Sequence, residues 1–199
     1  MRADGCARGR DCRARTRYHA RMSTPSPHVV NVDEVAEIEH LSGEHWGGAY
    51  KPLTPLLSAA AGRLGASLSR LPKGRVTCPF HYHQLEDEVF FILEGRGVLR
   101  YGDDVRVVRP GDCIACPAGT KVAHQIGNPF DEDLVYLAVG RNDPNEVAVY
   151  PDTGKVMVRS LGRVGYLEKV DYMLGEADEP KLFELAASLV EPLSSRAAG

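Results

Sequence analysis

Long hydrophobic runs are missing from this 199-residue chain. No apolar segment approaches the roughly 18 residues that a membrane-spanning helix needs, and no hydrophobic segment of a secretory signal is found near the first residue. We therefore expect a cytoplasmic protein without a membrane partner. Helices of about ten to fifteen residues do not alternate with the strand patterns, which argues against a parallel α/β fold. A helix-turn-helix segment is also missing, which argues against a DNA-binding regulator.

Positive charge is scarce outside the N-terminus. Residues 1–21 carry seven arginines against Asp4 and Asp11, a local charge of +5. Taking +5 from the net charge of −3 leaves −8 on residues 22–199, and this acidic balance argues against a nucleic-acid partner. We interpret residues 1–21 as a disordered tail or the product of an upstream translation start. An Arg-rich targeting peptide or a basic arm for an acidic partner is the alternative.

The cysteines do not form a disulfide framework. Their number, five, is odd, and no secretory signal precedes them, so a reducing compartment is expected. Cys113 and Cys116 form a single C-x-x-C pair, which is a weak zinc or redox signal. Residues i and i+3 of a strand face opposite sides, so we expect two buried, inert thiols. Cys78 has the opposite parity to His81, and we expect it to face away from any cavity that His81 lines.

Short strands separated by Gly, Pro and Asp turns dominate the middle of the chain. This rhythm predicts an antiparallel sandwich or barrel, with strands at residues 64–71, 75–83, 88–93, 97–101, 105–108, 113–116, 123–127 and 134–139. We predict a barrel core at 62–140, preceded by an extension at 22–61. Residues 141–199 are expected to wrap the barrel and to end in a helix at 179–190. That helix would dock on the barrel or pair with another subunit.

The stretch 80–95, FHYHQLEDEVFFILEG, is the centre of the chain. His81 and His83 share one face of a strand, because side chains at i and i+2 point the same way. A polar bend at 84–87 lets Glu88 face inward again, while Glu86 should face water. Two imidazoles and a carboxylate make a site for a first-row metal. The alternative is a metal-free barrel whose core histidines are hydrogen-bonded.

Two motifs in this region resemble those of the cupin superfamily. The family's G…H-x-H…E…G and G…P-x-G…H…N motifs have these counterparts: Gly74, His81, His83, Glu88 and Gly95, and then Gly111, Pro117, Gly119, His124 and Asn128. Two spacers, before His81 and before His124, are longer than in the family pattern. Both lie in loops, so they change loop length rather than the parity of the ligands. A narrower resemblance, carried by Glu86–Glu88, Leu93–Gly95 and Tyr150–Asp152, is to bacterial single-domain cupins without an assigned biochemical role.

The resemblance implies an all-β fold, a single cupin barrel (a double-stranded β-helix, or jelly roll) with an N-terminal extension and a C-terminal helix. It implies that one divalent first-row transition metal (Fe, Mn, Ni, Co or Zn) binds the ligands His81, His83, Glu88 and His124. Small cupins commonly pair, so a homodimer is expected.

We expect chemistry on a small organic molecule: dioxygenase, decarboxylase or isomerase, with Glu88 as a group for proton transfer. The expected substrate pocket consists of Phe90, Ile92, Tyr136 and Arg70. The alternative is a non-catalytic cupin that binds a small ligand or has a regulatory role.

Overall fold

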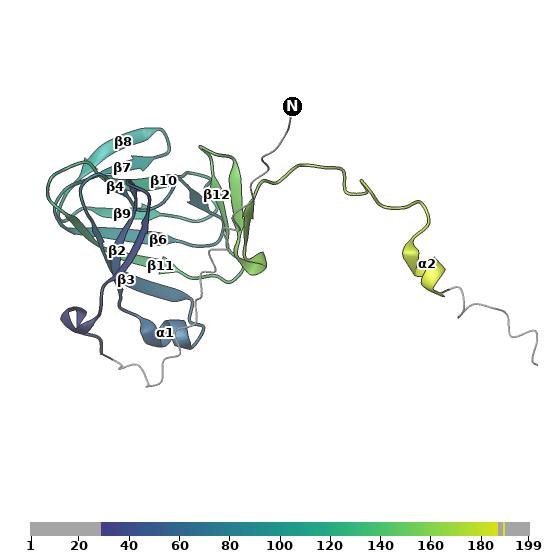
Figure 1. Cartoon of the computed structure of the whole chain (residues 1–199), viewed down its shortest axis with the longest axis horizontal. Coiled ribbons are helices and arrows are strands. Elements are labelled where there is room, and N and C mark those ends of the chain that lie inside the picture. Colours follow the sequence, from purple (N-terminus) through teal and green to yellow (C-terminus); the bar gives the residue numbers. More distant parts are fainter. Residues whose placement is uncertain (1–28, 187–188, 190–199) are drawn as a thin grey trace, which may run out of the picture.

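A computed structural model describes residues 29–186 and 189, so the predicted basic tail lies outside the described residues. Most of the regular structure in the described chain consists of strands, which form two sheets (Figure 1). The larger sheet has ten strands in the order β8-β7-β10-β4-β2-β3-β11-β6-β9, with β1 beside β2. The smaller sheet has the order β14-β13-β12-β5. None of the described helices is long and apolar enough to cross a membrane.

The strands of the larger sheet are β1 (Ile38–Ser42), β2 (Trp46–Pro52), β3 (Leu64–Leu71), β4 (Arg75–Val76), β6 (Glu88–Glu94), β7 (Gly97–Tyr101), β8 (Asp104–Val108), β9 (Cys113–Cys116), β10 (His124–Asn128) and β11 (Leu134–Arg141). Those of the smaller sheet are β5 (Tyr82–His83), β12 (Val147–Tyr150), β13 (Lys155–Val158) and β14 (Arg163–Gly165). The helices are short: η1 (Val32–Glu34), α1 (Pro55–Ala59), η2 (Arg159–Leu161) and α2 (Lys181–Ala186).

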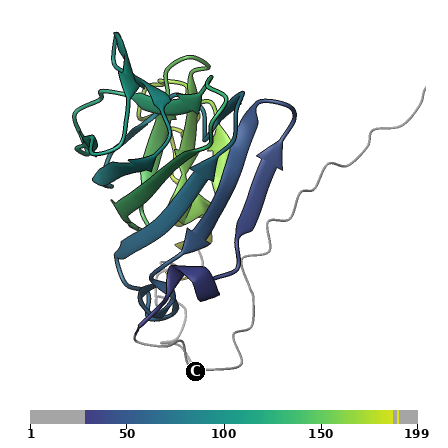
Figure 2. The same ribbon diagram turned by 90° about the vertical axis from the view of Figure 1, so that its left-hand side faces the viewer.

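The larger sheet curls on itself, with long antiparallel strands along one wall (Figure 2). Alternation along these strands sends every second side chain inward. In register across the wall, Ile92 of β6 lies opposite Tyr136 of β11, and Tyr136 lies opposite Ser69 of β3. This arrangement confirms the predicted all-β cupin jelly roll.

A single apolar core fills the curled sheet. It consists of Leu71, Ile92, Leu99, Val108, Ile114, Cys116, Ile126, Leu134 and Tyr136. Gly95 permits the tight turn after β6, because its φ is +70° and a Cβ there would lie 2.1 Å from the carbonyl oxygen of Asp133. The inward-facing positions of β6 run from Glu88, its first residue, to Ile92 in the core.

The predicted strand at 75–83 is divided in two. β4 pairs with β10 of the larger sheet, whereas β5 pairs with β12 of the smaller one. Pro79 lies between them and has no N–H to donate to a ladder. The break carries His83 into the second sheet, while His81 forms an isolated bridge with His124.

The C-terminal extension contributes strands only as far as Gly165. The chain then leaves the barrel as an extended arm that ends in α2 (Figure 1). Leu182 and Leu185 of α2 are exposed, so the structure does not show the first of the two expected arrangements, docking on the barrel. Pairing of this helix with another subunit stays a prediction.

The two faces of β6 give a direct stability test. Ile92→Ala removes a fully buried side chain and should lower the free energy of unfolding by about 2–5 kcal/mol. Leu93→Ala, on the adjacent and 41% exposed position, should change it by about 0.5 kcal/mol. Urea unfolding followed by circular dichroism measures both values. Equal losses in the two variants would show that the inward face of β6 is assigned incorrectly.

Candidate metal centre

Four predicted ligands converge where the two sheets meet. His81 and His124 face each other across a pair of backbone hydrogen bonds, from His81 N to His124 O at 3.2 Å and from His124 N to His81 O at 2.8 Å. His83 enters from β5, and Glu88 is the first residue of β6. One ligand atom from each of the four residues lies within 4.8 Å of the others.

The ligand atoms are unusually close to one another. Nε2 of His81 lies 3.0 Å from Nε2 of His83. Oε2 of Glu88 lies 3.1 Å from Nε2 of His83 and 3.0 Å from Nε2 of His124. Gly140 is paired with Glu88 across β6 and β11, and a Cβ on Gly140 would lie 3.3 Å from Glu88 Cγ. The missing side chain therefore leaves room for the carboxylate.

The outer ring nitrogens determine which lone pairs face inward. Nδ1 of His81 donates to the carbonyl oxygen of Pro79 at 2.8 Å, and Nδ1 of His83 donates to Oε1 of Glu146 at 3.3 Å. Both partners can only accept. In the neutral rings, the Nε2 lone pairs of His81 and His83 therefore point at each other.

Other polar atoms of the cluster lack hydrogen bonds. Oε2 of Glu88 and both ring nitrogens of His124 are buried and make none with any residue that the structure describes. Leaving buried polar atoms unpaired costs free energy. A proton relieves only one of the close contacts, whereas a divalent cation bound by one atom of each of the four residues relieves every contact between those ligand atoms. The donor set, three imidazoles and a carboxylate, also suits first-row metals. The site therefore fits a metal ion.

The protonation states agree with this fit. Burial, reinforced by the neighbouring His124 and His83, lowers the pKa of His81 to about 4. Burial alone would raise the pKa of Glu88, but the adjacent imidazoles of His124 and His83 outweigh it and lower that pKa. At neutral pH His81 is neutral and Glu88 is ionised, the forms in which both bind metals.

His83 differs from His81. Burial alone would lower its pKa, but the nearby carboxylates of Glu88, Glu146 and Glu86 outweigh burial and raise it. Protons therefore compete for His83 at a higher pH than they do for His81. As the pH falls, His83 should therefore be protonated before His81, and the loss of His83 as a ligand should be the first cause of weaker metal binding.

A small cavity of about 120 Å³ adjoins the cluster. Phe90 and Tyr136, two of the predicted pocket residues, line it. Ile92 does not, because it lies farther along β6 and is fully buried in the core. Arg70 does not line this cavity either, but it lines a neighbouring one together with Tyr136, and it pairs with Glu37 and Asp133. The parity of Ile92 was thus not enough to place its side chain at the site.

Two larger cavities share walls with the small one. One, of about 680 Å³, lies between the β1–β2 and β12–β13 hairpins and has Trp46, Phe80, Tyr150 and Lys155 in its lining. Tyr150 also stacks on His81, with ring centroids 5.9 Å apart. The other, of about 290 Å³, is rich in hydroxyl groups, which come from Tyr50, Ser67, Ser69, Thr77 and Tyr136.

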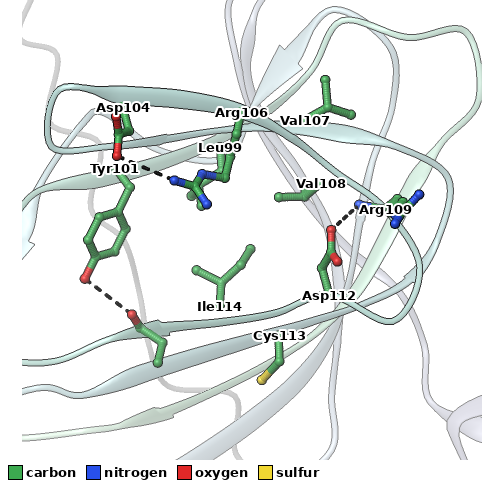
Figure 3. A pocket seen from close by; sticks show the side chains of 11 residues that line it. Leu99, Tyr101, Asp104, Arg106, Val107, Val108, Arg109, Asp112, Cys113 and Ile114 are labelled. Carbon is green, nitrogen blue, oxygen red and sulfur yellow. Dashed lines mark hydrogen bonds and ion pairs between the residues drawn. The ribbon is translucent and has the colours of Figure 1, made fainter.

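A further cavity of about 730 Å³ lies between the β7–β8 hairpin and β9 (Figure 3). Its two acids are already engaged: Asp104 pairs with Arg106, and Asp112 accepts from the backbone N–H of Arg109. Ile114 contributes part of an apolar wall. Neither group of close metal-ligand side chains among the described residues lies in this cavity. It therefore does not compete with the cluster as a metal site.

The structure corrects three expectations about nearby side chains. Glu86 does not face water: its carboxylate is buried and binds the guanidinium of Arg159. Cys78 does not face away, because it lines the small cavity with its sulfur 3.6 Å from Nδ1 of His81. Cys113 is exposed, and only Cys116 is buried as expected for that pair. The bend at 84–87 is present, but neighbouring segments bury one of its acids.

Sequence reasoning missed Glu146, Arg159 and Tyr150. All three lie beyond the barrel motifs, in the segment interpreted as a wrapping extension. Glu146 and Tyr150 reach the cluster through pairing between β5 and β12, in which Ala148 lies opposite His83, 65 residues earlier. Arg159 instead binds Glu86 beside it. The Tyr150–Asp152 triplet had been noticed for its resemblance, but no spacing rule connected it with His81.

Comparison with known proteins agrees with this geometry. Residues 67–140 match the model of the Cupin_2 family, described as a cupin domain. These residues therefore form a cupin domain. No curated protein sequence matches it significantly.

Two solved structures are similar to the chain. One is from Acidithiobacillus ferrooxidans and is named as a candidate sugar phosphate isomerase; identity is 26%, coverage is 63% of this chain and 82% of that one, and the TM-score is 0.55. The other is a cupin-superfamily sugar phosphate isomerase from Silicibacter pomeroyi; identity is 28%, coverage is 70% of this chain and 92% of that one, and the TM-score is 0.57.

The cysteine assignments can be tested by alkylation of the native protein at pH 8. Burial raises the pKa of the Cys78 thiol from 9.0 to about 11, which lowers its thiolate fraction about a hundredfold. Peptide mass spectrometry after brief iodoacetamide treatment should find Cys113 modified and Cys78 protected. Protein unfolded in urea is the control, in which both should react. Equal native reactivity of the two thiols would contradict the placement of Cys78 beside His81.

Proposed function

We propose that the chain is a metal-dependent cupin enzyme that isomerises a small sugar phosphate. The metal part of this proposal depends on one observation, the group of buried, mutually facing acceptor atoms on His81, His83, Glu88 and His124. The reaction part is supported by the names of the two similar structures and by the hydroxyl-rich cavity beside the cluster.

His81, His83, Glu88 and His124 would hold one divalent first-row ion. Such an ion supplies Lewis acidity, which polarises a carbonyl oxygen and stabilises negative charge that develops on it. Isomerisation of a sugar would need this stabilisation while a proton leaves the carbon beside the carbonyl and another arrives at the carbonyl carbon, and while the hydroxyl proton passes from one oxygen to the other. Substrate and product have the same formula, so no oxidant or reductant is required.

The side chains around the cluster suit such a substrate. Glu88 is the candidate group for proton transfer through its second oxygen, Oε1, which is not the one facing His83 and His124. Phe90 and Ile126 provide apolar walls that keep water out, which strengthens charge interactions in the cavity. Ser69, Thr77 and Tyr136 offer hydroxyls to those of a sugar.

Lys155 is the candidate for binding the phosphate. It lines the 680 Å³ cavity, and its Nζ lies 5.7 Å from the ring centroid of Tyr150. The acid in the same lining, Asp152, already accepts two hydrogen bonds from Arg100, at 2.6 and 3.0 Å. Since Arg100 neutralises Asp152, the charge of Lys155 remains available to an anion.

The metal part is tested by elemental analysis of protein purified without chelator. About one first-row metal per chain is expected after reconstitution. His81→Ala and His83→Ala should each lower the bound metal about tenfold or more. Mutation of a residue that only hydrogen-bonds to a metal ligand already lowers metal affinity about 10–100-fold, and loss of the ligand itself should cost at least as much. The matched control is His45→Ala, because His45 is exposed and its Nδ1 donates to the carbonyl oxygen of Gly74, away from the ligands. Full occupancy in both ligand variants would refute the ligand set.

The reaction part is tested by incubating the metal-loaded protein in D₂O with small aldose and ketose phosphates. NMR should show interconversion with solvent deuterium at the carbon beside the carbonyl, and the chelator-stripped protein should show none. Lys155→Met should raise KM about tenfold for a phosphorylated sugar, the equivalent of one charged hydrogen bond, and leave the unphosphorylated analogue unaffected. If no isomerisation is seen, the proposed reaction is wrong. Oxygen uptake would then indicate an oxygenase, and CO₂ release from carboxylic acids would indicate a decarboxylase.

A further inference from the structure

Glu146 is a fully buried carboxylate outside the four-ligand cluster. It lies between β11 and β12, and its side chain is 0% exposed. Burying a carboxylate is costly unless hydrogen bonds replace the water that it loses. The contacts that replace this water therefore indicate what the residue does.

Three N–H groups surround the carboxylate of Glu146. Oε1 accepts from Nδ1 of His83 at 3.3 Å and from the backbone N–H of Gln84 at 2.9 Å. Oε2 accepts from the backbone N–H of Leu85 at 2.9 Å. The carboxylate thus binds both the imidazole of His83 and the first half of the bend that leads from His83 to Glu88.

We propose that Glu146 is a positioning residue that makes His83 competent to bind the metal; this inference rests on the proposed metal site. Glu146 fixes the proton of His83 on Nδ1 and keeps the lone pair of Nε2 directed at the cluster. A hydrogen bond from the outer nitrogen also restricts rotation of the ring and makes the ligand nitrogen more basic. By binding the N–H groups of Gln84 and Leu85, Glu146 fixes the bend that places Glu88 beside His83.

The neighbouring acid, Glu86, does not share this role. Its Oε2 lies 3.8 Å from Nδ1 of His83, beyond hydrogen-bond distance. Both of its oxygens are bound by the guanidinium of Arg159, and Oε1 also accepts from the backbone N–H of Asp143. Glu86 therefore holds the loop rather than the imidazole.

His83, Glu86 and Glu146 are close enough to suggest a second metal site. The donors already present argue against it. Each carboxylate accepts from N–H groups, and the guanidinium of Arg159 occupies the position where a cation would bind Glu86. The positively charged guanidinium of Arg159 would also repel a divalent cation bound beside it. The group therefore supports the four-ligand cluster rather than forming a second centre.

The loop that carries Glu146 is itself anchored. The backbone N–H of Glu146 donates to the carbonyl of Asp143 at 3.1 Å, and its carbonyl accepts from Arg159 at 2.9 Å. Asp143 pairs with Arg63 and Arg141 at 3.0 and 2.7 Å. Asp143 has no contact with a ligand side chain among its described hydrogen bonds and ion pairs, so Asp143→Asn is a matched control for disturbance of the loop.

The test is a titration of the chelator-stripped, full-length protein with Co(II), followed by its visible absorption. Glu146→Ala should weaken Co(II) binding about 10–100-fold. Glu146→Gln keeps one acceptor oxygen and should recover most of this loss, and Asp143→Asn should bind Co(II) like the wild type even if it melts at a lower temperature. Wild-type affinity in Glu146→Ala would overturn the inference and leave the metal site standing. Failure of the wild-type protein to bind any Co(II) would overturn both.

Coupling to His83 separates positioning from a general structural role. In a His83→Ala background, adding Glu146→Ala should weaken Co(II) binding much less than it does in the wild type, because only its effect on the bend before Glu88 remains. The inference would be overturned if the loss of Co(II) affinity in the double variant equalled the product of the losses in the two single variants. A readout that needs no variant is the ¹⁵N NMR spectrum of the Zn(II)-loaded wild type, which should show His83 protonated at Nδ1. Protonation at Nε2 would contradict the proposal even if Glu146→Ala failed to fold.

Discussion

The imidazoles of His81 and His83 direct two ring nitrogens at each other across 3.0 Å, and the carboxylate of Glu88 lies within 3.1 Å of His83 in the same buried space. The surrounding strands hold these side chains in contact. The bridge between His81 and His124 closes one side, β6 brings Glu88 to the other, and the apolar core lies behind. Acceptor atoms so close together in a medium of low dielectric repel one another strongly unless positive charge lies between them. A bound cation is the simplest source of that charge.

The second sheet is as important to the site as the barrel. β5 belongs to it and carries His83, while β12 and the loop before it supply Tyr150 and Glu146. Arg159, just after β13, binds Glu86 and so secures the bend between His83 and Glu88. The metal-binding geometry is thus produced where two sheets join. This position also explains why the larger cavity beside the cluster is walled by both hairpins.

Much of the fold and the grouping of the four ligands could be predicted from the sequence. Strands of period two and the i, i+2 spacing of His81 and His83 are local signals, and Glu88 follows from the bend. Errors arose where burial depends on distant segments. Glu86 lies in a polar run and yet is buried, because Arg159 comes from 73 residues away to pair with it. Ile92 has the parity of Glu88 but lies deeper in the core, and Arg70 is bound by acids that no spacing rule identifies.

The central claim is that one cation lies among these four side chains. Its most direct test is anomalous diffraction from crystals of protein purified without chelator and reconstituted, with data collected on both sides of the absorption edge of the bound metal. One anomalous peak in contact with Nε2 of His81, His83 and His124 and with Glu88 is the predicted result. A reconstituted crystal with no peak there, and with Nε2 of His81 and His83 still in direct contact, would contradict the claim.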